Sequence, residues 1–193
     1  LPDEEAGGVH GSHWLVEHRR DIFEGVTEAV GEVGGFSLTV RDDLRLYLVQ
    51  TAEKGINWMR LRAAGRAGHG SMLNDDNAVT ALCEAVARVG QHRFPLVITP
   101  TVRDFVAALG EALGVELSTD DEEALLAQLG PLAGLVGATL RNTANPTMLE
   151  AGYKVNVIPG EASAHVDGRF LPGQEQEFLA ELDRVIGEKV QRE

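Results

Sequence analysis

The amino-acid sequence predicts two parts: a remnant of an α/β domain in residues 1–55 and an α+β, ferredoxin-like two-layer sandwich in residues 56–193. Two observations predict this. From residue 57 onward, the hydrophobic pattern follows the order strand, helix, insertion, strand, strand, helix. Ahead of it, a helical pattern lies between two loops rich in glycine and carboxylates, as expected at strand ends of an α/β sheet.

The first part is expected to hold a helix and a strand. The helix covers residues 12–31, and its apolar residues fall close to one face: Trp14, Leu15, Ile22, Phe23, Val26 and Val30. A glycine-rich turn follows at residues 31–35, and partial alternation predicts a strand from Leu44 to Thr51. The chain opens without a methionine on a dense acidic motif, so we expect an internal fragment.

The second part is expected to contain a helical insertion at about 91–138, because two prolines interrupt its start and helical patterns cover residues 101–113 and 121–129. The other expected elements are a strand from Asn57 to Ala64, a helix over residues 75–90 with Asn74, Asp75 and Asp76 as possible caps, strands over Thr139 to Thr143 and Ala162 to Leu171, and a helix from Gln174 to about Val190. The last strand of the sandwich is expected just past Glu193.

Composition and charge narrow the classes of function. With 44% hydrophobic and 24% charged residues, the 193-residue chain fits an ordinary soluble globular protein. The net charge of −13 opposes nucleic acid and anionic membranes, so neither is expected as a partner. The sequence lacks a spanning apolar run and a signal-peptide pattern, which predicts a cytoplasmic protein. The single cysteine, Cys83, is expected to be a buried structural thiol.

Two acidic loops are candidates for metal chemistry. The first is Asp3-Glu4-Glu5-Ala6-Gly7-Gly8, where one carboxylate can bind a metal while its neighbour takes a proton from metal-bound water. The second contains Glu32, in Gly31-Glu32-Val33-Gly34-Gly35. Loops at neighbouring strand ends can face one crevice, so Glu5 and Glu32 could share a site. Either motif alone would more often be a solvated surface loop.

Three further residues are candidates for substrate contact. His69 stands between glycines in Gly65-Arg66-Ala67-Gly68-His69-Gly70-Ser71-Met72, a setting that suits a hydrogen-bond donor to a developing oxyanion and equally suits a loop histidine without a role. Arg169 can grip a carboxylate with two parallel hydrogen bonds, and Asn156 can offer a donor and an acceptor. On the residues alone, a surface ion pair is the more common use of Arg169.

Taken in order, five motifs resemble the zinc-dependent aminoacylase, carboxypeptidase and succinyl-diaminopimelate desuccinylase family of metallopeptidases. They are the two acidic loops, the His69 loop, Lys154-Val155-Asn156-Val157-Ile158-Pro159 and Asp167-Gly168-Arg169. Each motif is short, but five in the order of the family span nearly the whole chain. The resemblance implies a partial zinc-hydrolase catalytic domain in residues 1–55 and a dimerisation domain in residues 56–193.

The resemblance also implies roles for single residues. It makes Glu4 the general base, Glu5 and Glu32 zinc ligands, His69 a group that steadies the scissile carbonyl in the other subunit's site, and Asn156 and Arg169 substrate-binding residues. The implied protein is a homodimer with a binuclear zinc site. It would hydrolyse amide bonds of N-acyl amino acids or small peptides, with the terminal carboxylate held by Arg169 and Asn156.

The chain lacks two motifs that the family contains. The His-x-Asp motif should precede residue 1, and a last histidine ligand should follow residue 193. His10, His13 and His18 lack matching neighbours and are expected to be surface or helix-packing residues. We therefore expect the chain alone to bind zinc weakly and to hydrolyse nothing. Two alternatives stay open: a non-catalytic dimerisation module, and a homologue that binds a ligand without cleaving it.

Overall fold

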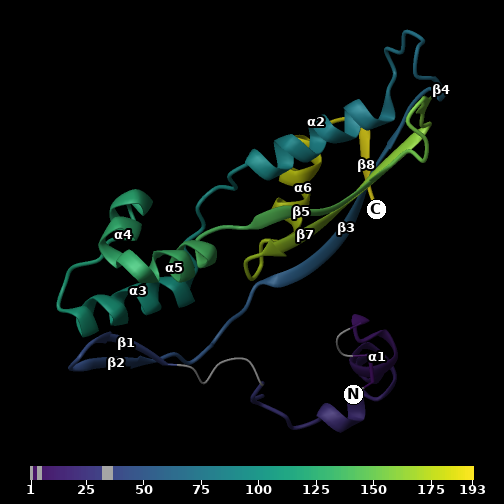
Figure 1. The fold of residues 1–193 in the computed structure, drawn as a ribbon. Coiled ribbons are helices and arrows are strands. Elements are labelled where there is room, and N and C mark those ends of the chain that lie inside the picture. Colours follow the sequence, from purple (N-terminus) through teal and green to yellow (C-terminus); the bar gives the residue numbers. More distant parts are fainter. Residues whose placement is uncertain (1, 4–5, 32–36) are drawn as a thin grey trace. The chain divides into compact units, whose positions relative to one another are not determined.

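The computed structural model describes residues 2–3, 6–31 and 37–193. The chain forms two compact units, Leu1–Gln50 and Thr51–Glu193 (Figure 1), whereas the sequence predicts a boundary between residues 55 and 56. Each unit is described by itself. None of the helices in the described ranges combines the length and the apolar character needed to cross a membrane.

The start of the first unit contains short helical turns. A π-helical turn, Val9–His13, leads into α1, Trp14–His18, and a 3-10 turn follows at Arg20–Phe23. The predicted helix over residues 12–31 is therefore too long. Arg19 leaves the helical region with a φ of −135°, and Gly25 adopts a φ of 78°, a conformation that interrupts a right-handed helix.

A hairpin ends the first unit. β1, Ser37–Arg41, pairs antiparallel with β2, Leu44–Tyr47. The sequence predicts the second of these strands, with a later end, and misses the first. The assignment of this unit to an α/β catalytic domain stays a prediction.

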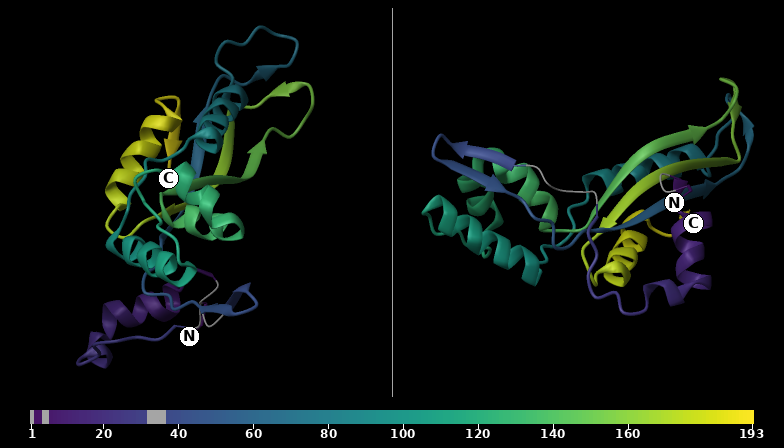
Figure 2. Two further views of the ribbon diagram at one scale, coloured as in Figure 1. Left: turned by 90° about the vertical axis from the view of Figure 1, so that its left-hand side faces the viewer. Right: turned by 90° about the horizontal axis from the view of Figure 1, so that it is seen from below.

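The second unit is built around a four-stranded antiparallel sheet with strand order β5-β7-β3-β8 (Figures 1 and 2). Its elements follow one another as β3, Gly55–Ala64; α2, Ala78–Gln91; β5, Thr143–Ala151; β7, Glu161–Phe170; α6, Glu175–Ile186; and β8, Val190–Arg192. This is the order of a ferredoxin-like sandwich, so the predicted α+β class is confirmed.

The fourth strand of the sandwich lies within the chain. Helix α6 ends at Ile186, because Gly187 adopts a φ of 75°, and β8 then pairs with residues 61–63 of β3. The predictions of a helix to Val190 and of a last strand past Glu193 are therefore wrong.

The strand predicted over Thr139 to Thr143 is also misplaced. Residues up to Thr139 belong to α5, Ala133–Thr139, and β5 begins only at Thr143. It then runs to Ala151 along the edge of the sheet, with a register shift between Pro146 and Met148.

Helices α2 and α6 pack on one face of the sheet. In β3, buried Leu61 and Ala63 alternate with exposed Arg60 and Arg62, so one face of the strand meets the helices. Phe178 of α6 is fully buried in this core. Replacement of Gly168 by a larger residue would disturb this core, since a Cβ atom at that position would lie 2.7 Å from the Phe178 ring.

The N-cap of α2 and the exposure of Cys83 on this helix differ from the prediction. Asn77, rather than the three residues before it, is the N-cap, and its side chain accepts hydrogen bonds from the backbone of Val79 and Thr80. The buried stripe of the helix is Ala78, Leu82, Ala85 and Val89. Cys83 lies outside this stripe and is exposed, so the prediction of a buried thiol is wrong.

The predicted insertion is helical and closes on itself. Its helices are α3, Pro100–Leu113, α4, Glu122–Leu129, and α5, which pack through Val102, Val106, Leu109, Leu125, Leu129, Val136 and Leu140. The two ends of the insertion meet where the backbone N–H of Val97 donates to the Leu140 carbonyl at 2.9 Å. There Glu122 forms ion pairs with Arg93 and Arg141. Burial raises the pKa of the Glu122 carboxyl group, but the two arginines together lower it further, so the pKa lies below its usual value.

Candidate functional site

Two loops meet beyond one end of the four-stranded sheet. β4, Gly68–His69, pairs antiparallel with β6, Val157–Ile158, so that His69 lies opposite Val157. Next to this pair, the N–H of Gly70 donates to the Asn156 carbonyl at 2.9 Å. The pairing therefore brings His69 and Asn156 together, although 87 positions separate them in the sequence.

The loop that carries His69 depends on a close backbone approach at its base. The N–H of Arg66 donates to the Asp76 carbonyl at 2.7 Å, which closes the loop just before α2. A Cβ atom at Gly65 would lie 2.6 Å from the backbone of Asp76 and Ala78. Only glycine fits at this position without a shift of the backbone.

The imidazole of His69 is exposed and has polar contacts on both nitrogens. Its Nδ1 lies 2.8 Å from the Ser71 hydroxyl and accepts the N–H of Ser71 at 3.3 Å. Its Nε2 lies 3.5 Å from Nδ2 of Asn156. The arrangement presents a histidine edge and an amide side by side to solvent, which is chemically suited to hydrogen bonding a carbonyl group.

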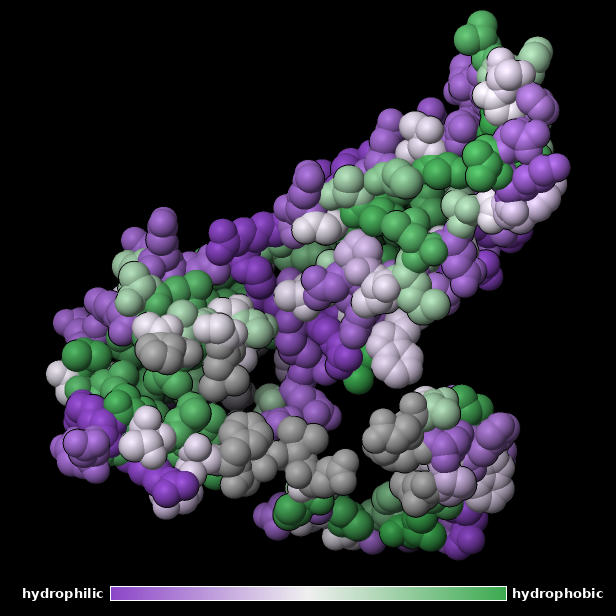
Figure 3. Space-filling view, viewed as in Figure 1, coloured by the Kyte–Doolittle hydropathy of each residue, from purple (hydrophilic) through white to green (hydrophobic). Residues whose placement is uncertain are grey.

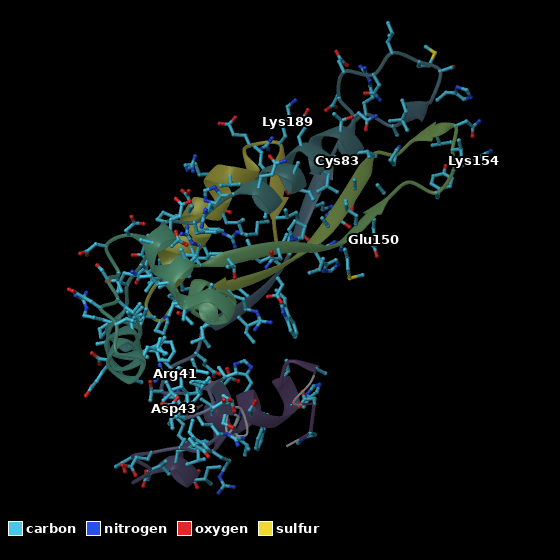
Figure 4. All side chains as sticks on the ribbon, turned by 60° about the vertical axis from the view of Figure 1, so that its left-hand side comes forward. Arg41, Asp43, Cys83, Glu150, Lys154 and Lys189 are labelled. Atoms are coloured by element: carbon cyan, nitrogen blue, oxygen red, sulfur yellow. The ribbon has the colours of Figure 1, made fainter. Side chains whose placement is uncertain are left out.

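Exposed apolar side chains flank this polar pair. Met72 and Leu73 follow His69 in one loop, with relative exposures of 68% and 99%, and Tyr153 and Val155 precede Asn156 in the other, with 84% and 106%. Figure 3 shows hydrophobic and hydrophilic residues next to each other at this end of the unit. Figure 4 marks Lys154 in the turn between β5 and β6, and Glu150 further back on β5.

Arg169 already holds a carboxylate of its own strand. Its Nε and Nη2 donate to the two oxygens of Asp167 at 2.6 and 2.9 Å, in the two-pronged geometry that arginine forms with carboxylates. This hydrogen bonding lowers the pKa of Asp167 and raises that of Arg169. The strand ion pair that the residues alone favour is thus present. The substrate-binding role implied by the resemblance stays a prediction.

Arg169 lies far from His69 and Asn156. It is near the end of β7, opposite Ile56 and Thr143, whereas the two site loops adjoin the start of β7 at Glu161. A strand advances about 3.3 Å per residue, so Arg169 lies roughly 26 Å along β7 from Glu161. One small substrate cannot touch Asn156 and Arg169 of the same copy.

Lys54 forms a polar junction that the sequence does not predict. Its ammonium donates to the carbonyls of Ala138 and Arg141, at 3.1 and 2.7 Å, and to the Thr143 hydroxyl at 3.2 Å. Burial and the nearby charge of Arg169 lower the pKa of Lys54 to about 8. No local pattern could reveal this residue, because its partners lie 84 to 89 positions away.

The proposed general base and metal ligands cannot be placed. Glu4, Glu5 and Glu32 lie outside the described residues. Residues 2–3, 6–31 and 37–193 contain no group of three or more histidine, cysteine or acidic side chains able to hold a metal ion. The histidines of the first unit, His10, His13 and His18, are exposed as predicted, and His18 stacks on Trp14 with ring centroids 4.9 Å apart.

Comparison with known proteins gives relatives among acyl-amino-acid hydrolases and peptidases. The chain is 28% identical over 95% of its length to an N-fatty-acyl-amino acid synthase/hydrolase, PM20D1, of Xenopus tropicalis. It is 25% identical over 97% of its length to N-fatty-acyl-amino acid synthase/hydrolase PM20D1.1 of Danio rerio, and 27% identical over 89% of its length to aminoacylase-1 of Sus scrofa. It spans 38%, 38% and 33% of these relatives, respectively.

The solved structures that resemble the chain include an M20 family metallo-carboxypeptidase of Sulfolobus solfataricus, with 19% identity and a TM-score of 0.44 over 73% of this chain and 43% of that one. A family model provides the assignment. The model described as the peptidase dimerisation domain, of the M20 peptidases, matches residues 51–192, which are almost the whole second unit. The chain therefore belongs to the M20 peptidase dimerisation-domain family.

Proposed function

We propose that the intact protein is a homodimeric, metal-dependent hydrolase that cleaves the amide bond of N-acyl amino acids or small peptides. The observation that carries the proposal is the pairing of β4 with β6, which sets His69 beside Asn156 in an M20 dimerisation domain. The relatives named as an aminoacylase and as acyl-amino-acid hydrolases support this substrate class.

In the proposed reaction, Glu4 takes a proton from the attacking water and returns it to the leaving amine. His69 donates a hydrogen bond to the carbonyl oxygen as negative charge develops on it. Glu5 and Glu32 would hold zinc together with ligands from the rest of the protein, and zinc supplies Lewis-acid activation of water.

The separation of the binding residues favours a site made by two copies. His69 and Asn156 lie at one end of the sheet and Arg169 at the other, roughly 26 Å away along β7. In a symmetric dimer, Arg169 of one copy and Asn156 of the other could still meet on one substrate carboxylate. Asp167 would keep the guanidinium oriented until the substrate arrives.

The edge of the sheet offers a surface for the second copy. β5 is a nine-residue edge strand, and its Met148 and Leu149 are 54% and 56% exposed. Hydrophobic residues gather over β5 and α2 in Figure 3. An unpaired strand edge with apolar neighbours is a template for antiparallel pairing with the same edge of another copy.

Substitution on this edge tests the dimer. Leu149→Arg should turn the purified 193-residue chain from dimer to monomer in sedimentation velocity, because each copy would bring an unpaired charge into the interface. Val49→Arg, at a more exposed position in the first unit, should leave the dimer intact. A monomeric wild-type chain, or a dimer that survives Leu149→Arg, would contradict this interface.

Turnover and metal content test the reaction. In the intact protein, Glu4→Gln should lower kcat by roughly 10²–10⁴-fold on an N-acyl amino acid while the metal stays bound, since only proton transfer is lost. Glu5→Ala should lose metal as well, because a ligand is removed. The 193-residue chain alone should bind zinc weakly and show no turnover. Near-normal turnover of Glu4→Gln, or full metal occupancy of Glu5→Ala, would sink this division of roles.

A further inference from the structure

The face of the sheet that α2 and α6 leave open carries apolar side chains next to Arg169. Successive residues of a strand point to opposite faces, so Ile56 and Trp58 of β3 lie on the same open face as Arg60. The register of β3 against β7 sets Ile56 opposite Arg169 and Trp58 opposite Asp167. Directly opposed residues of antiparallel strands point to one face, with Cβ atoms about 4.5–5.5 Å apart. Two apolar side chains therefore adjoin the ion pair of Arg169 with Asp167.

Both apolar side chains are open to a ligand. Trp58 has a relative exposure of 64% and Ile56 of 55%, whereas Met59, between them and the helices, has 2%. An exposed apolar side chain gains free energy when an apolar ligand group covers it. Trp58 is also held in place, since the pKa of Asp167 is lowered mainly by the hydrogen bonds of Arg169 and further by that of Trp58. The indole thus stays beside the guanidinium.

Arg169 keeps hydrogen-bonding capacity for a second carboxylate. Asp167 accepts from Nε and Nη2 along one edge of the guanidinium, and no group among the described residues accepts from Nη1. A guanidinium has five N–H groups, so its outer end, formed by Nη1 and the second N–H of Nη2, can bind another carboxylate while Asp167 stays in place. The Arg169 side chain is 37% exposed, which gives a ligand access to this end.

The local charge favours an anion in spite of Asp167. Lys54 donates to the hydroxyl of Thr143, and Thr143 lies opposite Arg169 on the side away from β3. Burial, and then the charge of Arg169, lower the pKa of Lys54 to about 8, so the two cations are close enough to interact. At neutral pH Lys54 remains mostly charged. Together with Arg169 and Asp167 it gives this end of the sheet one net positive charge.

We propose that Ile56, Trp58 and Arg169 form a subsite for an amino-acid residue with a free carboxylate and an apolar side chain. The guanidinium binds the carboxylate, and the indole and the isoleucine cover the side chain. As an account of substrate preference, the inference rests on the proposed function: among N-acyl amino acids, the intact protein selects those with side chains such as that of leucine. Binding of such a carboxylate does not require turnover, so the subsite and the hydrolase can fail separately.

The ratio of two substrates tests the subsite in the intact protein. N-acetylglycine has the carboxylate of N-acetyl-leucine without its side chain, so wild-type kcat/KM should be about tenfold or more higher for N-acetyl-leucine. Trp58→Ala should lower this leucine-to-glycine ratio about three- to tenfold and leave N-acetylglycine nearly unchanged, because only the apolar contact is lost. Trp58→Phe keeps an aromatic ring and should keep most of the ratio. Val115→Ala, at an exposed apolar position of the insertion, is the matched control and should not change it.

Binding without turnover is measured by fluorescence of the 193-residue chain. Its only tryptophans are Trp14 and Trp58, so Trp14→Phe leaves Trp58 as the sole reporter. Isocaproate has the carboxylate and the side chain of leucine but no amide bond, and it should change the emission of Trp58 in a saturable way. Acetate, which lacks the side chain, and isocaproamide, which lacks the charge, should have little effect at the same concentrations.

The two experiments separate the subsite from the reaction. An unchanged leucine-to-glycine ratio in Trp58→Ala, or equal losses on both substrates, would overturn the subsite. The same conclusion would follow if isocaproate left the Trp58 emission unchanged, or if isocaproamide bound equally well. Saturable binding of isocaproate, with an intact protein that cleaves no N-acyl amino acid, would contradict the proposed function and leave the subsite in place.

Discussion

Mixed dimers of two inactive variants should recover about half of the wild-type activity. In the intact protein, Glu4→Gln removes the base and His69→Ala removes the oxyanion donor, so each homodimer should lose roughly 10²-fold or more in kcat. If His69 serves the site of the other copy, a mixed dimer contains one site with an intact Glu4 and an intact His69. If His69 serves its own copy, each site of the mixed dimer lacks one group.

The experiment needs purified mixed dimers, obtained by co-expression with two different affinity tags. Recovery of about half of the wild-type activity, which corresponds to one intact site of two, supports a role of His69 in the site of the other copy. A mixed dimer as inactive as its parents, with both tags present, would place His69 in its own copy's site. A mixture of Glu4→Gln with Glu4→Gln,His69→Ala is the matched control, since neither arrangement rebuilds a site there.

Phe178→Ala should have the largest effect on stability. Phe178 is fully buried, and its ring lies 5.2 Å from that of Phe94 and 6.1 Å from that of Phe170. Removal of a buried phenyl group leaves a cavity and costs about 3–5 kcal/mol in the free energy of unfolding. Urea unfolding followed by circular dichroism measures this loss.

Tyr153→Ala provides the control for Phe178→Ala. Tyr153 is 84% exposed, so its removal should change the free energy of unfolding by less than about 0.5 kcal/mol. Equal losses in the two variants would mean that the aromatic cluster between α6 and the sheet contributes little to stability.

Hydrophobic periodicity was sufficient for the elements that bury one face. β3, α2, β7 and the insertion helix α3 have regular apolar spacing, and the structure places them close to the predicted residues. The edge strands of the sheet, β5 and β8, lack this hydrophobic periodicity. β5 leaves most of its side chains exposed, so its sequence shows little alternation. The sequence predicts a helix to about Val190, since Val190 continues the helical spacing of Val185 and Ile186, but Gly187 ends α6 through its positive φ.

The candidate site was predictable only in part. The glycines around His69 marked its loop, but the approach of Asn156 depends on pairing between β4 and β6 across the fold. The distance from Asn156 to Arg169 follows from the register of β7, which no motif contains. Ser71 could have been noticed from its position two residues after His69, since serine at that spacing often hydrogen bonds locally. The cytoplasmic location stays a prediction.

The helical insertion has a consequence for how sequences of this kind can vary in length. The chain enters and leaves it at one point, where Leu96 bridges Arg141 and Val97 bonds to Leu140. The entropy of closing a loop grows only slowly with its length. Whole helices can therefore be gained, lost or exchanged between Phe94 and Asn142 while α2 and β5 keep their places in the sandwich. The insertion is thus a position where a new recognition surface can be added without refolding the sheet that carries it.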